Sequence, residues 1–342
     1  MRGRTINGSR DLLQVGVCAI AIRPSSTQPT RVVFGGAESY IPVMQQSPGC
    51  EPDLLVAPSL TEAYEVLPGR RDAGLLVICD HAQNTIPAEY GTLGLAPDQL
   101  GRHIAYDIGA YGVASRIARE LGAPAISTRF SRLLIDPNRG LDDPTLIMRL
   151  SDGAVVPGNR KVDVAERDRR AARFYEPYHA ALDELIEDCV AAGVPPVLLS
   201  VHSFTEVWKD SRRPWHAAIL WDRDYRFAVP LLQALRSEKG LVVGENEPYD
   251  GKLAGDCMWQ HGTRRGLAHT IVEVRQDLIR DEAGQAEWGE RIATAVKGIL
   301  ERPDLRELLH NVHYFGSHTD TEAAPPFSSH AVAAHKGDNR ES

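Results

Sequence analysis

The sequence predicts an α/β fold, with a single three-layer α/β/α domain built on a mixed, largely parallel sheet. Short continuous apolar runs such as Leu75–Cys79 are typical of strands that are buried on both faces. Longer segments with helical character separate these runs, and this alternation is the order of α/β proteins. The 342 residues, 43% of them hydrophobic, are enough for one large domain.

Most of the predicted strands begin close to a proline or a glycine, which marks the start of each extended segment. In chain order, we expect a strand at 75–80, a helix near 97–121, and strands at 124–128 and 132–136. A long helix near 163–192 leads to strands at 196–201 and 216–221, which precede a helix near 226–238. Strands at 241–244 and 269–274 and a helix near 284–301 complete the prediction.

The two ends of the chain differ from its centre in composition. Residues 1–67 contain Pro24-Ser25-Ser26 and no sustained helical period, so we expect a loosely ordered extension, within which Met44 is an alternative start. Residues 68–316 would form the folded domain. Residues 317–342, with Ala323-Ala324-Pro325-Pro326, would form a disordered tail.

Composition excludes several classes of partner. A net charge of −8 argues against a general nucleic-acid binder, because phosphate binding needs a concentrated basic surface. The apolar stretch Leu12–Ile22 is too short to span a bilayer, so no membrane partner is expected. Five scattered cysteines without a C-x-x-C pair fit a reducing cytoplasm. The oligomeric state stays open.

Two histidines follow apolar strands at the edge where ligands collect in open α/β sheets. His81 comes just after the strand at 75–80, and His202 follows the longest apolar run. Imidazoles are common ligands of Zn²⁺, and two of them with an oxygen ligand and a water would form an open catalytic site. The alternative for each is a histidine held by a structural hydrogen bond. Another divalent metal is also compatible with these ligands.

The third metal ligand has two candidates. His103 and Asp107 lie four residues apart, which would place them on one face of the helix predicted there. Either Asp107 or Asn84 could supply the oxygen, and a carboxylate is the better ligand for zinc. We expect His103 to be an outer partner of the site or an ordinary helix residue.

Charged residues near the same strand ends could carry the chemistry. Glu273 could be the base that activates a water, and Arg139 and Arg275 could hold an anionic substrate. The amide of Asn138 could add a donor beside Arg139. The alternatives are structural: Arg139 could pair with a nearby aspartate, and Glu273 and Arg275 could belong to an internal row of ion pairs.

The order of these pieces resembles the zinc carboxypeptidase superfamily, which has a phosphorylase/hydrolase-like fold. The resemblance implies a metal-binding His202, a carboxylate-binding Asn138 and Arg139, and a general base at Glu273. Members of that superfamily carry a His-x-x-Glu ligand pair. Here His81 is followed three residues later by Asn84.

A narrower set of motifs resembles the N-formylglutamate amidohydrolase family over roughly residues 70–300. These motifs are Asp80–Pro87, His103–Ala110, His202–Thr205, Asn246–Tyr249 and Glu273–Leu278. The resemblance implies a metal-dependent catalytic domain that hydrolyses an N-acyl amide on an amino acid, most specifically N-formyl-L-glutamate to formate and glutamate. Arg132 or Arg275 would meet the second carboxylate of such a substrate. The alternatives are another N-acylamino-acid or peptide amidase and a non-catalytic protein that binds small ligands.

Overall fold

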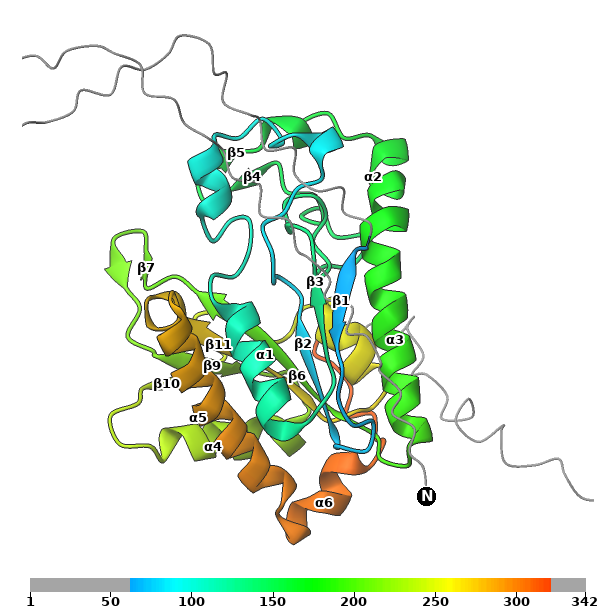
Figure 1. Cartoon of the computed structure of the whole chain (residues 1–342), viewed down its shortest axis with the longest axis vertical. Coiled ribbons are helices and arrows are strands. Elements are labelled where there is room, and N and C mark those ends of the chain that lie inside the picture. Colours follow the sequence, from blue (N-terminus) through cyan, green and yellow to red (C-terminus); the bar gives the residue numbers. More distant parts are fainter. Residues whose placement is uncertain (1–61, 321–342) are drawn as a thin grey trace, which may run out of the picture. The chain divides into compact units, whose positions relative to one another are not determined.

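The computed structural model describes residues 62–320, and a sheet of seven strands forms its centre (Figure 1). The strands lie in the order β1-β3-β2-β6-β11-β9-β10. Their bounds are β1 (Tyr64–Leu67), β2 (Leu75–Cys79), β3 (Ala125–Thr128), β6 (Val197–Phe204), β9 (Ala217–Leu220), β10 (Val243–Glu245) and β11 (His269–Arg275).

The sheet is mixed and largely parallel, as the sequence predicts. Strands β3, β2, β6 and β11 are mutually parallel, so their carboxyl ends meet at one edge. The outer strands run the other way: β1 is antiparallel to β3, and β9 is antiparallel to β11 and parallel to β10. All residues of β2, β6 and β11 are buried, which explains the continuous apolar sequence of β2 and the apolar runs within β6 and β11.

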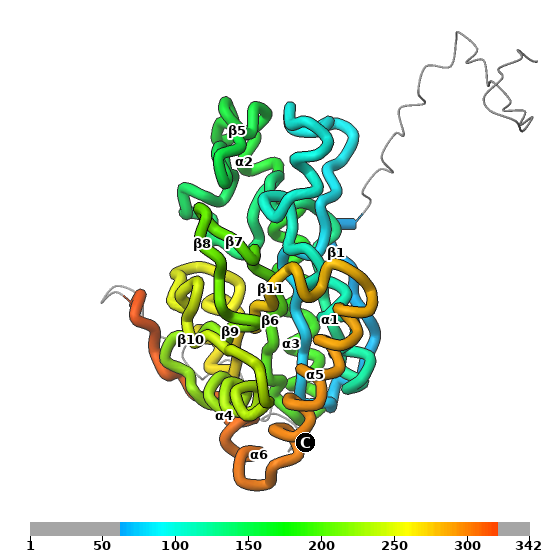
Figure 2. The backbone as a smooth tube through the Cα atoms, turned by 90° about the vertical axis from the view of Figure 1, so that its left-hand side faces the viewer, coloured from blue at the N-terminus to red at the C-terminus, as the bar shows by residue number. Residues whose placement is uncertain are grey.

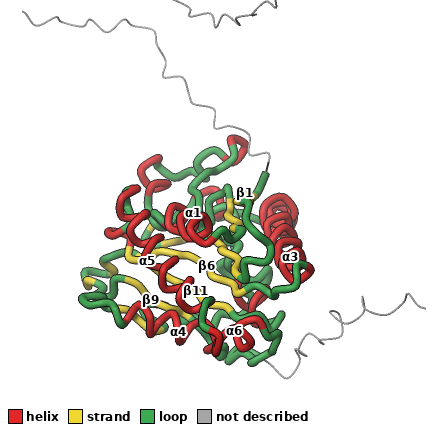
Figure 3. The backbone as a smooth tube through the Cα atoms, turned by 60° about the horizontal axis from the view of Figure 1, so that its bottom comes forward, coloured by secondary structure: helices red, strands yellow, loops and turns green. Residues whose placement is uncertain are grey.

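Helices cover both faces of the sheet. Alternate residues of β2 point to opposite sides, so Leu75 and Val77 pack against α1, α4 and α5, whereas Leu76 and Ile78 pack against α3. Helices α1 and α5 lie side by side in two views (Figures 1 and 2), and in Figure 3 the helices surround the strands. The α-helices are α1 (Ala110–Leu121), α2 (Val164–Arg170), α3 (Glu176–Ala191), α4 (Tyr225–Arg236), α5 (Glu282–Leu300) and α6 (Pro303–His310). The three-layer α/β/α prediction is therefore confirmed.

The remaining elements are short. Two hairpins form from β4 (Leu150–Ser151) with β5 (Ala154–Val155) and from β7 (Val207–Trp208) with β8 (Ser211–Arg212). The 3₁₀ turns are η1 (Ala88–Tyr90), η2 (Pro97–Gly101), η3 (Pro157–Asn159) and η6 (Gln276–Leu278). The π turns are η4 (Ala171–Tyr175) and η5 (Trp259–Thr263). Because η4 joins α2 to α3, the helix predicted at 163–192 is one helical segment with a π turn inside it.

Two predicted elements are wrong. The helix expected at 97–121 is interrupted, because only η2 and α1 are helical and the residues between them form turns. The strand expected at 132–136 is also a series of turns: the Ser131 hydroxyl accepts the Leu133 N–H, which bends the chain. Side chains take the place of a neighbouring strand as hydrogen-bond donors to this segment. The Asn159 amide donates to the Leu133 carbonyl, and the Arg170 guanidinium donates to the Leu134 carbonyl.

The described residues can be compared with the expected limits of the folded domain, 68 and 316. Strand β1 pairs with β3, so the sheet begins at Tyr64, within the range 1–67 in which we expected a loosely ordered extension. The rest of that extension, residues 1–61, and residues 321–342 of the expected tail lie outside the described residues. None of the helices between residues 62 and 320 is long and apolar enough to cross a lipid bilayer.

Candidate metal centre and active site

A cavity of about 480 Å³ opens at the carboxyl ends of the parallel strands. His202 lies on β6 and Glu273 on β11, in register with each other, and His81 follows β2 by two residues. This is the place where open α/β sheets bind their ligands. The predicted residues that line it are His81, Asp107, Arg132, Asn138, Arg139, His202 and Glu273, together with His103.

Three of these side chains converge on one point. The Asp107 Oδ2 lies 2.8 Å from His202 Nδ1 and 3.4 Å from His81 Nδ1. One ligand atom from each of the three residues lies within 4.8 Å of the others, and all three side chains are buried. Two imidazoles and one carboxylate are the donor set of many catalytic zinc sites.

Each histidine is oriented by a second carboxylate on its far side. His81 Nε2 lies 2.7 Å from Asp136 Oδ1, and His202 Nε2 lies 3.2 Å from Asp80 Oδ2. A neutral imidazole that donates its Nε2 proton to a carboxylate presents the lone pair of Nδ1 on the opposite side. Both Nδ1 atoms therefore face Asp107, which is the arrangement that metal-binding histidines adopt.

Asp80 and Asp136 are themselves held in place. Asp80 accepts hydrogen bonds from the Tyr178 hydroxyl at 2.7 Å and from the Ser200 hydroxyl at 3.0 Å. The guanidinium of Arg132 donates to Asp136 Oδ2 from Nε at 3.0 Å and from Nη2 at 2.7 Å. Arg132 lines the cavity, but two of its nitrogens serve to orient Asp136.

The electrostatics favour an ionised third ligand. Burial alone would raise the pKa of Asp107, but the charges and hydrogen bonds of His81 and His202 hold that pKa well below its usual range. Burial opposes the charge of His202, yet the hydrogen bonds that its ring donates to the carboxylates of Asp107 and Asp80 raise its pKa well above the usual value. The centre therefore attracts positive charge, as a cation site must.

Glu273 is a buried acid that lines the same cavity as the three converging residues. Its side chain is 6% exposed, and its Oε2 has no hydrogen-bond partner among the described residues. Burial raises the pKa of Glu273 to about 7, against the opposing charge of His202. A carboxylate with a free oxygen and a pKa near neutrality suits a group that takes a proton from water and returns it.

Arg139 is the cation of the cavity that is available to an anion. Its Nη1 donates to the Asn138 carbonyl at 2.7 Å and its Nε to the Thr145 hydroxyl at 3.3 Å. No carboxylate of the described residues forms an ion pair with it, so the alternative considered for Arg139, a pairing with a nearby aspartate, does not form there. Asn138 Oδ1 accepts the Cys257 N–H, which leaves the Asn138 Nδ2 to act as a donor.

Two predicted residues do not join the site. The guanidinium of Arg275 pairs with Asp277, 2.7 Å from Nε to Oδ1, and donates to the carbonyls of Arg213 and Trp215. It is therefore a structural residue, outside the set that lines the cavity. Asn84 is also outside this set and donates from Nδ2 to the Leu100 carbonyl, whereas Asp107 lies with the two histidines.

His103 lies at the wall of the cavity, away from the three converging ligands. Its Nε2 is 3.4 Å from Asp152 Oδ2 and makes no hydrogen bond within the described part of the chain. His103 is in a turn, so the shared helix face expected for it and Asp107 does not form.

Sequence reasoning missed the outer aspartates and part of the cavity wall. Asp80 and Asp136 could have been found, because each stands inside a motif that also holds a predicted site residue. Trp208 and Asp256 come from a short hairpin and a loop, and no motif marks them, whereas Tyr249 belongs to the motif Asn246–Tyr249 but has no predicted role in the site. Only the folded chain brings these three side chains to the cavity.

The fold and the site together define a hydrolytic enzyme built on a mixed α/β sheet. The chain belongs to the N-formylglutamate amidohydrolase family, whose family model matches residues 73–280. Enzymes of this family hydrolyse a linear amide, and the resemblance noted from the motifs is confirmed. Comparison with curated proteins gave no match.

Two solved structures are similar to this chain. A gene product of Agrobacterium tumefaciens is 35% identical, with a TM-score of 0.64, and the match covers 70% of this chain and 97% of that one. An N-formylglutamate amidohydrolase from Ralstonia eutropha JMP134 is 25% identical, with a TM-score of 0.57, over 72% of this chain and 98% of that one. The name of the second structure agrees with the family assignment.

Proposed function

We propose that this enzyme removes the formyl group from N-formyl-L-glutamate, giving formate and glutamate, with a divalent metal ion as cofactor. The observation that carries the proposal is the convergence of His81, Asp107 and His202 beside the unpartnered carboxylate of Glu273. The amidohydrolase family and the similarity to the N-formylglutamate amidohydrolase of Ralstonia eutropha support amide hydrolysis of this kind.

His81, Asp107 and His202 would hold the metal ion, and zinc is the ion that this donor set favours. When bound, such an ion acts as a Lewis acid that polarises a carbonyl and lowers the pKa of water. The outer aspartates, Asp136 and Asp80, keep both histidines in the ligating orientation.

Glu273 would move the proton of the reaction. Its free Oε2 accepts a proton from the attacking water, whose oxygen forms a bond to the formyl carbon. The carbon–nitrogen bond of the amide then breaks, and Glu273 gives the proton to the leaving nitrogen. The products are formate and the free amino acid, and the carboxylate of Glu273 is regenerated.

Arg139 and Asn138 would hold the substrate through its α-carboxylate. A guanidinium can bind a carboxylate through two parallel hydrogen bonds, and the Asn138 Nδ2 adds a third donor. The second carboxylate of glutamate would meet Arg132, whose Nη1 is the nitrogen least committed to Asp136. We assign no substrate contact to Arg275, because its guanidinium is paired with Asp277.

The size of the cavity supports a second candidate, an amidase for larger N-acylamino acids. A volume of about 480 Å³ is within the range of sites for drug-sized ligands, which exceed N-formylglutamate. Met148, Trp208 and Tyr249 supply apolar wall that a formyl group alone would not cover. Rates on N-formyl, N-acetyl and longer N-acyl glutamates separate the two candidates.

The proposal is tested by measuring formate release from N-formyl-L-glutamate. We expect turnover by the zinc-loaded enzyme, loss of turnover after dialysis against a chelator, and recovery on adding Zn²⁺. N-formyl-L-leucine is the control for the second carboxylate and should be a poorer substrate. Full turnover after verified metal removal would contradict metal dependence, and absence of formate release with each of Zn²⁺, Mn²⁺ and Co²⁺ would contradict the proposed substrate.

A further inference from the structure

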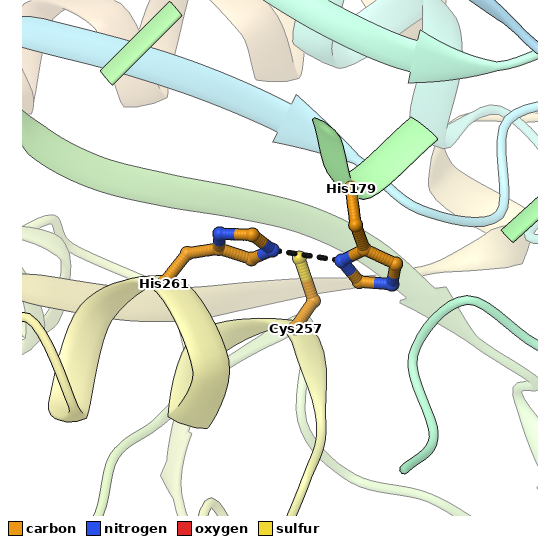
Figure 4. A group of neighbouring side chains, drawn as sticks. All are labelled: His179, Cys257 and His261. Atoms are coloured by element: carbon orange, nitrogen blue, oxygen red, sulfur yellow. Dashed lines mark hydrogen bonds between the residues drawn. The ribbon is translucent and has the colours of Figure 1, made fainter. Parts of the chain in front are cut away.

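A second group of buried side chains that could bind a metal lies on the face of the sheet that α3 covers. This is the face opposite to the one covered by α1. It consists of His179 on α3, Cys257 just before η5, and His261 within η5 (Figure 4). The exposed fractions are 7%, 0% and 3%. None of the three lines the cavity of the proposed active site.

The two imidazoles face each other through ring nitrogens. His179 Nδ1 lies 2.7 Å from His261 Nε2, and the two ring planes are nearly parallel, at 11°, with centroids 5.0 Å apart. Figure 4 shows the sulfur of Cys257 directed at the gap between these two nitrogens. One ligand atom from each residue lies within 4.8 Å of the others.

The outer ring nitrogens determine where the protons are. His179 Nε2 lies 3.0 Å from the Pro137 carbonyl oxygen, and His261 Nδ1 lies 2.9 Å from Asp183 Oδ1. A carbonyl only accepts, and so does a carboxylate, so each histidine must donate its outward proton. Two neutral imidazoles have then used both of their protons.

The two inward nitrogens are therefore lone pairs pointing at each other. At 2.7 Å they repel unless something positive lies between them, either an extra proton or a metal ion. An extra proton would place an imidazolium in a buried position. A metal ion would satisfy both lone pairs and the sulfur together, and the carbonyl and carboxylate behind the rings are the usual outer partners of metal-bound histidines.

We propose that His179, Cys257 and His261 form a second metal site, which takes a thiolate-preferring divalent ion such as Zn²⁺. Ligand nitrogens of a tetrahedral zinc are about 3.3 Å apart, so the rings would move apart by about 0.6 Å. Uptake would release the thiol proton of Cys257. The ion would be structural, because the site is buried and lies outside the cavity.

Such an ion would brace one wall of the active site. It would join α3 to the segment that carries Asp256, which lines the cavity. The backbone N–H of Cys257 also donates to Asn138 Oδ1, so the position of the Asn138 amide depends on the same segment. The competing arrangement is a metal-free one, in which the histidines share a proton and the thiol interacts with Asp80.

Cobalt substitution distinguishes the two arrangements without reference to activity. The first centre offers no sulfur, so of the two centres within residues 62–320 only the second can give a thiolate-to-metal charge-transfer band with cobalt in the near ultraviolet. We expect the full-length chain to bind about two equivalents of Co²⁺ with this band present. Cys257→Ser should bind about one equivalent and lose the band.

Two further variants serve as controls. Cys189→Ser changes a different buried cysteine, which lies on α3, and this variant should keep both equivalents of Co²⁺ and the charge-transfer band. The double variant His81→Ala with His202→Ala should lose one equivalent and keep the band, which separates this site from the first. If Cys257→Ser does not fold, His261→Asn tests the same loss with the thiol in place. A wild-type protein without the band, or a band that survives Cys257→Ser, would overturn the proposal.

Discussion

At the scale of single residues, the site depends on carboxylates behind the histidines. Asp136 and Asp80 fix which nitrogen of His81 and His202 faces inward, and Asp107 completes the convergence. The cost of burying these acids is offset by dense hydrogen bonding, since burial would raise the pKa of Asp136 but Arg132 and His81 hold it well below its usual range. The centre is therefore organised before any ligand arrives.

The role of Arg139 leads to a prediction at the same scale. Arg139→Lys keeps the charge but loses the two-point grip on a carboxylate, so KM for N-formyl-L-glutamate should rise by about 10- to 100-fold. The kcat should change far less, because the carboxylate does not react. Steady-state kinetics of Arg139→Lys and of Arg160→Lys, an exposed arginine, provide the comparison. An unchanged KM would remove Arg139 from substrate binding.

Site residues could be predicted where a chemically suitable side chain stands at the end of an apolar strand. His81, His202 and Glu273 follow from strand ends, and the fold does bring them together. For Arg275 the sequence left both a substrate role and an ion pair open, because the carbonyls of Arg213 and Trp215 that hold its guanidinium come from a segment about 60 residues away. The same holds for Asn84, whose amide is taken by a backbone carbonyl 16 residues away.

At the scale of elements, the break before α1 places the third ligand. Gly109 begins this helix with φ at 81°, a left-handed conformation that side chains disfavour. A Cβ there would lie 2.1 Å from the Ile279 carbonyl oxygen. The Asp107 N–H donates to the His81 carbonyl, so a continuous helix would pull Asp107 away from the histidines.

A glycine substitution tests this element. Gly109→Ala should lower the free energy of unfolding by about 1–3 kcal/mol or more, because of the strained backbone and the contact with Ile279. It should also weaken metal binding through Asp107. Gly101→Ala is the matched control, because the added Cβ meets no atom within 4 Å. Urea denaturation measures the free energy of unfolding of both variants. Equal values for Gly109→Ala and Gly101→Ala would contradict the proposed constraint at Gly109.

Element prediction from sequence succeeded where strands are long and apolar and failed where side chains replace the backbone as partners. The segment 132–136 is apolar enough for a strand, but Asn159 and Arg170 take its carbonyls. Both partners lie more than ten residues away, so no local pattern reveals them. Likewise, β1 is only four residues long and was not distinguished from the extension before it.

At the scale of the whole molecule, the function of the fold is to gather residues that are distant in sequence. Four parallel strands end at one edge, so His81, His202 and Glu273 meet although up to 192 residues separate them. Strands β9 and β10, which are parallel to each other and run opposite to β11, extend the sheet past β11. This architecture could be predicted from the order of elements, whereas the cavity wall could not, since loops and a hairpin supply it.

In the proposed metal-dependent deformylation, Glu273 moves the proton. The most direct test is the kcat of zinc-loaded Glu273→Gln on N-formyl-L-glutamate, with zinc content measured on the same sample. Glu245→Gln, at an exposed position on β10, is the control. We predict unchanged zinc content and a kcat lower by about 10²- to 10⁴-fold for Glu273→Gln alone. Near-normal kcat in that variant would contradict the account.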